Sequence, residues 1–180
     1  MKLIETTPNT YRFEGGVTLP RVTSILSVVH KFDGIPLDVL AHAAERGKAA
    51  HRAVWLLESG GDGSGLDRST LHPEVTPYVE SYEKAKAALR FEVVRSEYLV
   101  TSLRFGFAGR VDLFVNWKGK DGILDLKTGA EHWSHRYQVS AYAEAERETT
   151  KTRKPLWRWI LYLRDTGRYR VMDLEEGSLQ

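Results

Sequence analysis

Two short segments contain the side chains that hydrolysis of a phosphodiester bond requires. Gly109-Arg110-Val111-Asp112 lies within an apolar run, and Asp125-Leu126-Lys127-Thr128-Gly129 follows after a short polar turn. Asp is rarely buried unless it is paired or bound to a metal, yet both Asp112 and Asp125 have apolar neighbours on each side. Two carboxylates and a lysine could therefore bind a divalent cation and position a phosphate for cleavage.

A hairpin would bring the two carboxylates together. Alternate residues of a strand share a face, so Asp112 lies on the side of Arg110, and Asp125 on the side of Lys127. If Lys118-Gly119 is a tight turn, which requires positive φ, Asp112 opposes Asp125. Opposed Cβ atoms lie about 4.5–5.5 Å apart, near enough for two carboxylates to share one cation. The opposite face would then hold Val111, Leu113, Val115 and Trp117.

Lys127 points into the same space as Asp125, because it stands two residues further along the strand. There it can contact the scissile phosphate or help to deprotonate the attacking water. The alternative is a salt-bridged cluster of Asp112, Asp125 and Lys127 on a solvated face of the sheet. The two strands alone leave both interpretations open.

A helix upstream supplies a candidate third ligand. From Pro36 to Glu58, apolar and small residues recur at steps of three and four, which places His51 on the inward face. An imidazole is a frequent metal ligand, whereas a lone histidine on such a stripe is more often a hydrogen-bonded core residue. His51 is therefore either a ligand beside the carboxylates or part of the core.

These features, in this order, resemble the PD-(D/E)XK nuclease superfamily and, within it, the RecB-type branch. The resemblance runs from about Pro20 to Ala145. Its motifs are Arg46-Gly47 with His51, Arg95-Ser96-Glu97-Tyr98, Gly109-Arg110-Val111-Asp112, Asp125-Leu126-Lys127-Thr128-Gly129, and Gln138 with Tyr142. Leu19-Pro20-Arg21-Val22-Thr23-Ser24-Ile25-Leu26 and His72-Pro73-Glu74-Val75 resemble the mitochondrial genome-maintenance exonuclease and its phage and bacterial relatives, which trim single-stranded ends.

The resemblance implies an α/β fold with a restriction-endonuclease-like core, in which helices flank a central mixed sheet, as a single nuclease domain over residues 1–180. It implies one or two Mg²⁺ or Mn²⁺ ions and makes Lys127 the catalytic lysine. The metal ligands would be His51, Asp112, Asp125 and the backbone carbonyl of Leu126. Glu97 would bind a second metal or position water, unless it is an exposed strand glutamate.

Five further residues are candidates for substrate binding. Gln138 and Tyr142 stand one helical turn apart and would face the site, although Tyr142 also suits ordinary helix packing. Arg110 shares a strand face with Asp112 and would meet a phosphate or form a surface ion pair. Trp133 lies on a loop after Lys127 and would stack a base, which is worth roughly 1–3 kcal/mol. Arg46 completes the set.

Two departures from the superfamily pattern stand out. Residue 111 is Val where the superfamily's name has Pro, which RecB-type members commonly lack. The chain also contains no cysteine, so it cannot form the four-cysteine iron–sulfur cluster of several relatives. The lack of cysteine and of a Gly-x-Ser-x-Gly motif also argues against acyl-transfer chemistry.

Composition is ordinary for a globular domain of 180 residues, with 42% hydrophobic and 28% charged residues. No apolar run approaches the roughly 20 residues needed to span a bilayer, and the N-terminus is no signal peptide. We therefore expect a cytoplasmic protein without a membrane partner. The net charge of +2 is too small to indicate nucleic-acid binding by itself, but basic residues gather between Lys151 and Arg170. They would follow a phosphate backbone or only keep an edge hairpin soluble.

The elements that must position these residues follow from periodicity and turn signals. We expect strands near 11–14, 92–101, 107–117, 122–127, 156–163 and 169–172, and helices near 23–30, 36–58, 73–89 and 134–148. The stretch from Ser59 to Gly65 is flexible by composition.

The sequence thus favours a metal-dependent DNA nuclease, most simply an exonuclease on single-stranded or frayed ends in recombination, repair or replication. A helicase or a recombinase is a possible partner, and the oligomeric state is open. The alternatives are a catalytically silent nuclease fold that binds DNA or assembles with other proteins, and an endonuclease of the same fold.

Overall fold

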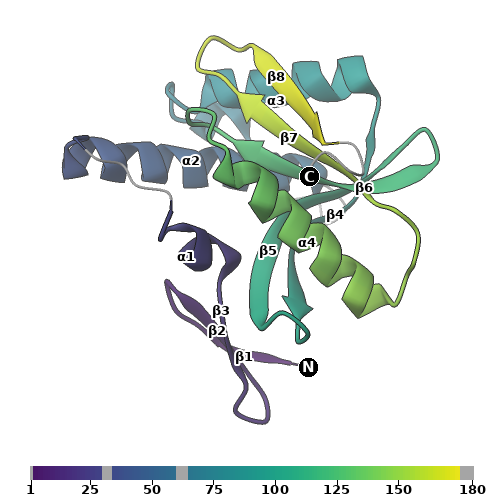
Figure 1. Cartoon of the computed structure of the whole chain (residues 1–180). Helices are drawn as coiled ribbons and strands as arrows, with labels where there is room; N and C mark the ends of the chain where they lie inside the picture. The colour runs from purple at the N-terminus through teal and green to yellow at the C-terminus, as the bar shows by residue number, and fades with distance from the viewer. Residues whose placement is uncertain (1, 30–33, 60–64, 175–180) are drawn as a thin grey trace.

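The computed structural model describes residues 2–29, 34–59 and 65–174 (Figure 1). The strands are β1 (Leu3–Thr6), β2 (Thr10–Phe13), β3 (Thr18–Pro20), β4 (Glu92–Ser102), β5 (Phe107–Trp117), β6 (Lys120–Lys127), β7 (Trp157–Leu163) and β8 (Tyr169–Leu174). The α-helices are α1 (Val22–Leu26), α2 (Leu37–Glu58), α3 (Thr76–Leu89) and α4 (Ser134–Thr150), with a 3-10 turn at Arg68–Thr70. Most of the expected flexible stretch, residues 60–64, lies outside the described residues.

A five-stranded sheet in the order β4-β5-β6-β7-β8 forms the centre of the fold. Only β6 and β7 are parallel, and α4 connects them, because parallel strands need a crossover rather than a hairpin. Ile160, Leu161, Tyr162 and Leu163 are all buried on β7, as befits a strand that is covered on both faces. The expected mixed α/β sheet flanked by helices is confirmed.

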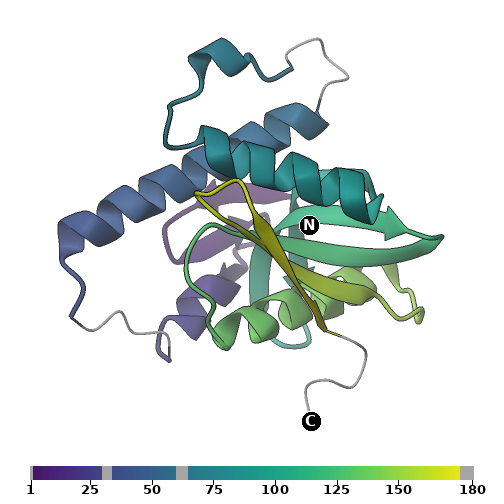
Figure 2. The same cartoon turned by 90° about the horizontal axis from the view of Figure 1, so that it is seen from above.

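Helices cover both faces of this sheet (Figure 2). Side chains from α2 and α3, among them Val54, Val79 and Tyr82, pack with Leu113 and Leu124 in one hydrophobic cluster. A second cluster lies on the side of α4 and α1, with members Val22, Val139, Ile123 and Ile160. The sheet therefore separates two cores.

The β5–β6 hairpin has the expected register. Lys118 and Gly119 both take positive φ, +51° and +76°, as a two-residue hairpin turn requires. Trp117 pairs with Lys120, and the pairing continues to Leu113 with Leu124. There it stops, although β5 still pairs with β4 and β6 still pairs with β7. The sheet thus forks at the positions of Asp112 and Asp125.

The expected strict alternation of β5 is wrong at the fork. Val111 belongs to the cluster on the α4 side, whereas Leu113 belongs to the cluster under α2 and α3. Opposite this irregularity, Glu97 on β4 takes φ of +50°. Regular pleating is interrupted where the functional side chains gather.

A small N-terminal sheet was not expected. Strands β1, β2 and β3 form a three-stranded antiparallel sheet, which lies below the main sheet in Figure 1. Its buried residues Tyr11, Phe13 and Leu19 pack on Ala108 of β5, and Arg21 forms a single parallel bridge with the same residue. Only β2 had been expected, because β1 and β3 are too short to show a clear alternation.

The remaining elements differ from expectation mainly at their ends. Helix α1 ends at Leu26 rather than near residue 30, and α3 begins at Thr76 rather than Pro73. The C-terminal hairpin forms as expected, but Arg164 and Arg170 both bind Glu131, so part of its positive charge is neutralised. Within the described part of the chain, no helix is both long and apolar enough to cross a membrane.

Candidate active site

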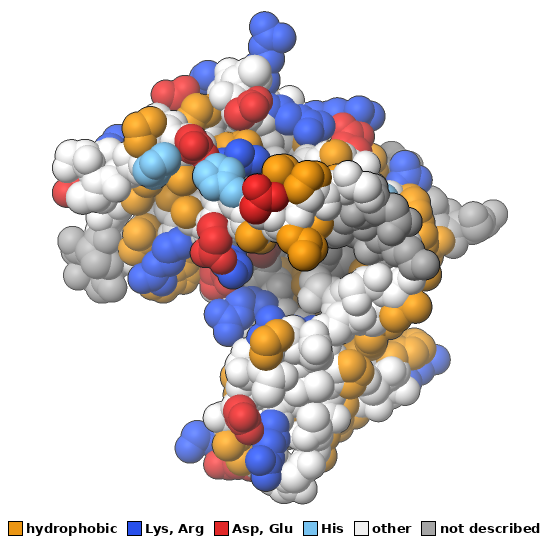
Figure 3. All heavy atoms as spheres, turned by 90° about the vertical axis from the view of Figure 1, so that its left-hand side faces the viewer, with side chains coloured by type: hydrophobic (Ala, Val, Ile, Leu, Met, Phe, Trp, Pro, Cys, Tyr) orange, Lys and Arg blue, Asp and Glu red, His pale blue; other side chains and the backbone are white. Residues whose placement is uncertain are grey.

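A cavity of about 780 Å³ lies between α2, the N-terminal segment and the forked end of the sheet. Seen from the end of α2, the surface is hollowed there, with charged side chains of both signs around the hollow (Figure 3). The sequence-predicted residues that line the cavity are His51, Glu97, Arg110, Asp112, Lys127, Gln138 and Tyr142. They come from α2, β4, β5, β6 and α4, so the fold gathers residues that are far apart in the sequence.

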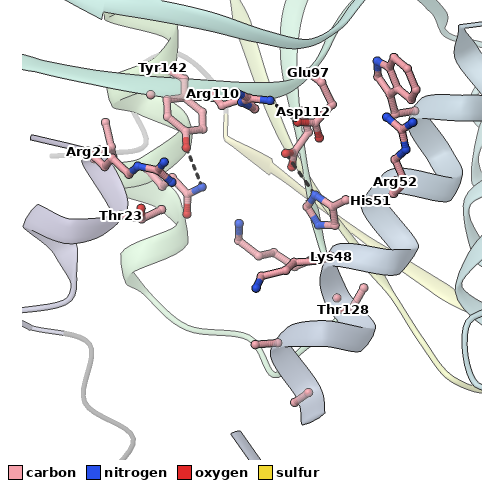
Figure 4. Close-up of a pocket in the computed structure, with 18 of the residues that line it drawn as sticks. Arg21, Thr23, Lys48, His51, Arg52, Glu97, Arg110, Asp112, Thr128 and Tyr142 are labelled. Atoms are coloured by element: carbon pink, nitrogen blue, oxygen red, sulfur yellow. Dashed lines mark hydrogen bonds and ion pairs between the residues drawn. The ribbon is translucent and has the colours of Figure 1, made fainter. Parts of the chain in front are cut away.

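Asp112 lies at the centre of the polar contacts. Its Oδ1 is 3.2 Å from Nδ1 of His51 (Figure 4). Its Oδ2 accepts a 2.7 Å hydrogen bond from the backbone N–H of Leu126. Burial opposes the charged form of Asp112, but the charge of His51 and their contact outweigh it and lower the pKa of Asp112. At the fork, the Asp112 side chain therefore accepts the hydrogen bond from Leu126 that a backbone carbonyl of a paired strand would otherwise accept. The lowered pKa keeps the Asp112 carboxylate ionised.

The same contact acts on His51. Burial alone would lower its pKa, but the charge of Asp112 and the contact between the two raise it above the usual value. Without a metal ion, Asp112 thus makes His51 easier to protonate than an ordinary histidine. A metal ligand must be neutral imidazole, so binding of a cation would release a proton.

Glu97 completes a compact group of ligand atoms. One ligand atom each from His51, Glu97 and Asp112 lie within 4.8 Å of one another. Burial, followed by the charge of Asp112, raises the pKa of Glu97 to about 7. Its backbone φ of +50° is uncommon for a residue other than glycine and costs on the order of 1–3 kcal/mol. Strained backbone of this kind often marks a functional position.

Asp125 lies just beneath the cavity and is fully buried. Its Oδ2 is 2.6 Å from Nζ of Lys127, and its Oδ1 accepts a 3.1 Å hydrogen bond from Nε2 of Gln138. Burial raises the pKa of Asp125 to about 6; Lys127 opposes this shift and Asp112 adds to it. The carboxylate is therefore held on both sides, by a cation and by an amide.

Tyr142 fixes this arrangement from the side of α4. Nε2 of Gln138 donates a 3.0 Å hydrogen bond to the Tyr142 hydroxyl as well as the bond to Asp125. The Tyr142 ring lies so close to β5 that a Cβ on Gly109 would be 2.3 Å from its Cε1. Gly109 is thus needed for contact between the helix and the sheet.

We predict that Gly109→Ala disturbs this contact. The added methyl group must displace the Tyr142 ring, and overpacking of this kind costs typically 1–3 kcal/mol. The free energy of unfolding, measured by urea denaturation, should fall by about that amount. Gly129→Ala is the matched control, because a Cβ there meets nothing within 4 Å; equal losses in both variants would contradict the prediction.

Two predicted substrate contacts lie outside the cavity lining. The Arg46 guanidinium stacks over the Tyr78 ring at 5.5 Å, toward α3. Trp133 is 51% exposed at the start of α4 and meets Tyr137 edge-on at 5.5 Å. The Trp133 indole is accessible, as base stacking would require.

The cavity is also lined by three basic residues and a threonine to which the sequence assigned no role. Arg21 and Thr23 come from the N-terminal segment, while Lys48 and Arg52 come from α2 (Figure 4). Lys48 stands three residues before His51 and four before Arg52, so the helical period could have indicated that it shares a face of α2 with each of them. Arg21 reaches the cavity only through packing of the small sheet on β5, which no local pattern encodes.

A profile of the PD-(D/E)XK nuclease superfamily matches residues 27–177. The chain belongs to the PD-(D/E)XK nuclease superfamily. No curated protein matches it in a direct sequence comparison. The forked five-stranded sheet with helices on both faces is consistent with the restriction-endonuclease-like core of this superfamily.

Nucleases of the PD-(D/E)XK superfamily use divalent metals, and the cavity suits one. Carboxylate oxygens with one imidazole match a hard divalent cation such as Mg²⁺ or Mn²⁺. A cation would also offset the repulsion between Glu97 and Asp112 that helps to raise the pKa of Glu97. Ligand atoms of His51, Glu97 and Asp112 lie near enough to one another to contribute to such a metal site.

The raised pKa of Glu97 predicts a pH-dependent effect in the metal-free nuclease. Below pH 4.5, its ordinary pKa, Glu97 is protonated in both folded and unfolded chains. Between pH 4.5 and about 7 the unfolded chain gives up this proton while the folded chain keeps it, so folding stability falls as the pH rises and levels off above about 7. Glu97→Gln cannot ionise and should gain stability relative to the wild type between pH 5 and pH 8.

Melting temperatures in EDTA at the two pH values test this. Glu92→Gln, which removes an exposed glutamate from the same strand, is the control. If the difference in melting temperature between Glu97→Gln and the wild type were the same at both pH values, the pKa of Glu97 would not be raised in the folded chain.

Proposed function

We propose that this chain is a Mg²⁺- or Mn²⁺-dependent deoxyribonuclease of the RecB-type branch, and an exonuclease that acts on single-stranded or frayed ends. The observation that carries the proposal is the convergence of His51, Glu97, Asp112 and Lys127 on one cavity, with Asp125 directly beneath. The preference for ends is supported by the resemblance of Leu19–Leu26 and His72–Val75 to enzymes that trim them.

Each residue has a distinct part in this proposal. Asp125 and the backbone carbonyl of Leu126 complete the ligand set of His51 and Asp112, and Glu97 binds a second ion or positions water. A bound divalent ion polarises the phosphoryl oxygen and lowers the pKa of water. Lys127 contacts the scissile phosphate and orients the attacking water. The water's proton passes by way of Lys127 to solvent as the new P–O bond forms, and the leaving oxygen takes up a proton from solvent as its bond to phosphorus breaks.

The surrounding residues keep this arrangement in place and bind the substrate. Gln138 holds Asp125 and is itself held by Tyr142, so the carboxylate keeps its orientation when Lys127 turns to the phosphate. Arg110, which is 3.9 Å from Glu97, is exposed enough to meet a phosphate. Trp133 stacks a base at the rim, and Arg46 supports substrate from the side of α3.

A digestion series separates this proposal from its alternatives. The metal-free protein is supplied with Mg²⁺ or Mn²⁺ and given end-labelled linear single strands, linear duplexes and closed circles. An exonuclease degrades linear single strands and leaves circles intact, whereas cutting of circles identifies an endonuclease. Binding without cleavage of any substrate identifies a silent nuclease fold. Lys127→Ala, purified in parallel, controls for contaminating nucleases.

A further inference from the structure

The N-terminal segment forms the wall of the cavity that faces the metal-ligand group. Tyr11, Arg21 and Thr23 line the cavity but precede the region, residues 27–177, that matches the superfamily. In Figure 4, Arg21 and Thr23 lie across the open space from His51, Glu97 and Asp112. This wall therefore precedes the matched region, and its side chains face the substrate space.

Most other basic side chains of the cavity form an ion pair with a carboxylate, and Arg21 differs from them in this respect. Lys127 is paired with Asp125, Arg110 with Glu97, and Lys48 with Glu45. Across the described ranges of the chain, no carboxylate forms an ion pair with Arg21. Its Nε atom is buried and has no hydrogen-bond partner there. A buried donor of this kind costs free energy unless an acceptor arrives.

The position of Arg21 is nevertheless fixed. Its guanidinium carbon lies 4.6 Å from the centre of the Tyr11 ring, and its backbone N–H donates a 2.9 Å hydrogen bond to the Asn9 carbonyl. The bridge to Ala108 ties the same residue to β5. Stacking occupies the face of the guanidinium and leaves its edge, with the N–H groups, for an anion. A planar guanidinium suits a phosphate in this role.

We propose that Arg21 and Thr23 form a second phosphate-binding site for the nucleic-acid strand, separate from the site of cleavage. The guanidinium donates to the oxygens of one backbone phosphate, and the Thr23 hydroxyl donates to the same group. Lys127 and the metal ligands bind the scissile phosphate on the other side of the cavity. Arg21 therefore binds a neighbouring phosphate and fixes the register of the nucleic-acid strand. This inference rests on the proposed function.

Binding measurements without metal test this site directly. A labelled single-stranded oligodeoxynucleotide is titrated in EDTA, where cleavage does not intervene, at several salt concentrations. Each phosphate contact contributes roughly −0.7 to the slope of log K against log salt for single strands. Arg21→Gln should make the slope less negative by about that amount and weaken binding about tenfold or more. Arg104→Gln, which removes an exposed arginine stacked on Phe105 outside the cavity, should change neither.

The identity of the phosphate is found by neutralising one position at a time with a methylphosphonate. A methylphosphonate at one position of the oligodeoxynucleotide should weaken binding by the wild-type protein. The same substitution should not change binding by Arg21→Gln. An unchanged slope and an unchanged methylphosphonate profile in Arg21→Gln would overturn the proposal, as would a wild type that binds no DNA. If Arg21→Gln melts below the assay temperature, Thr23→Val replaces it and must lose the same position. Arg21-dependent binding by a protein that cuts nothing would refute the nuclease activity and leave this site standing.

Discussion

Lys127→Met should slow DNA cleavage by about 10²- to 10⁴-fold, the range that a positioned proton-transfer group contributes. The Lys127 side chain is 18% exposed and faces the cavity, so it can reach both Asp125 and a phosphate. Its methionine replacement has a similar length but no charge and no donor. Single-turnover cleavage of a labelled oligodeoxynucleotide at saturating Mn²⁺ measures the rate.

Two further variants make this result specific. Lys127→Arg keeps the charge and the pairing with Asp125 but cannot lose a proton, so its melting temperature should stay near the wild-type value while cleavage falls. Lys86→Met removes a comparable ion pair, 2.7 Å from Glu58 on another part of the fold, and should cleave normally. Wild-type cleavage by Lys127→Met would remove the lysine from the mechanism.

Asp112→Asn should abolish stabilisation by a divalent cation. A ligand at 100 times its Kd stabilises a protein by about 2.7 kcal/mol, and Mn²⁺ should raise the melting temperature of the wild type accordingly. Asp112 is the member of the ligand group that contacts both His51 and the Leu126 N–H. Asparagine keeps one carbonyl oxygen for that N–H but loses the charge, so the fold persists while cation affinity falls.

The measurement is a thermal melt across a Mn²⁺ titration that begins in EDTA. Asp121→Asn is the matched control, since Asp121 accepts a hydrogen bond from Asn116 in the β5–β6 hairpin, away from the cavity. The control should be stabilised by Mn²⁺ as the wild type is. Equal stabilisation of Asp112→Asn would mean that the cation binds elsewhere.

Local patterns were sufficient for the strands and helices that carry the candidate site. The turn at Lys118-Gly119 determined the hairpin register, and the apolar stripe of α2 placed His51 inward. The geometry of Glu97 could not be predicted in the same way, because strand alternation gives no sign of a positive φ at a glutamate within β4. The placement of Arg21 depends on contacts between a small sheet and Ala108, more than eighty residues away. Alternation and helical period describe single elements and contain no information on such contacts.

The fork of the sheet has a consequence for how this chain could lose activity over evolutionary time. The Leu126 N–H has Asp112 as its acceptor, and a buried N–H without an acceptor costs about 1–3 kcal/mol. If Lys127 were lost instead, the carboxyl group of Asp125 could take up a proton. A descendant that had drifted to a purely binding role should therefore have lost Lys127 before Asp112, and retention of that aspartate would be a poor indicator of retained catalysis.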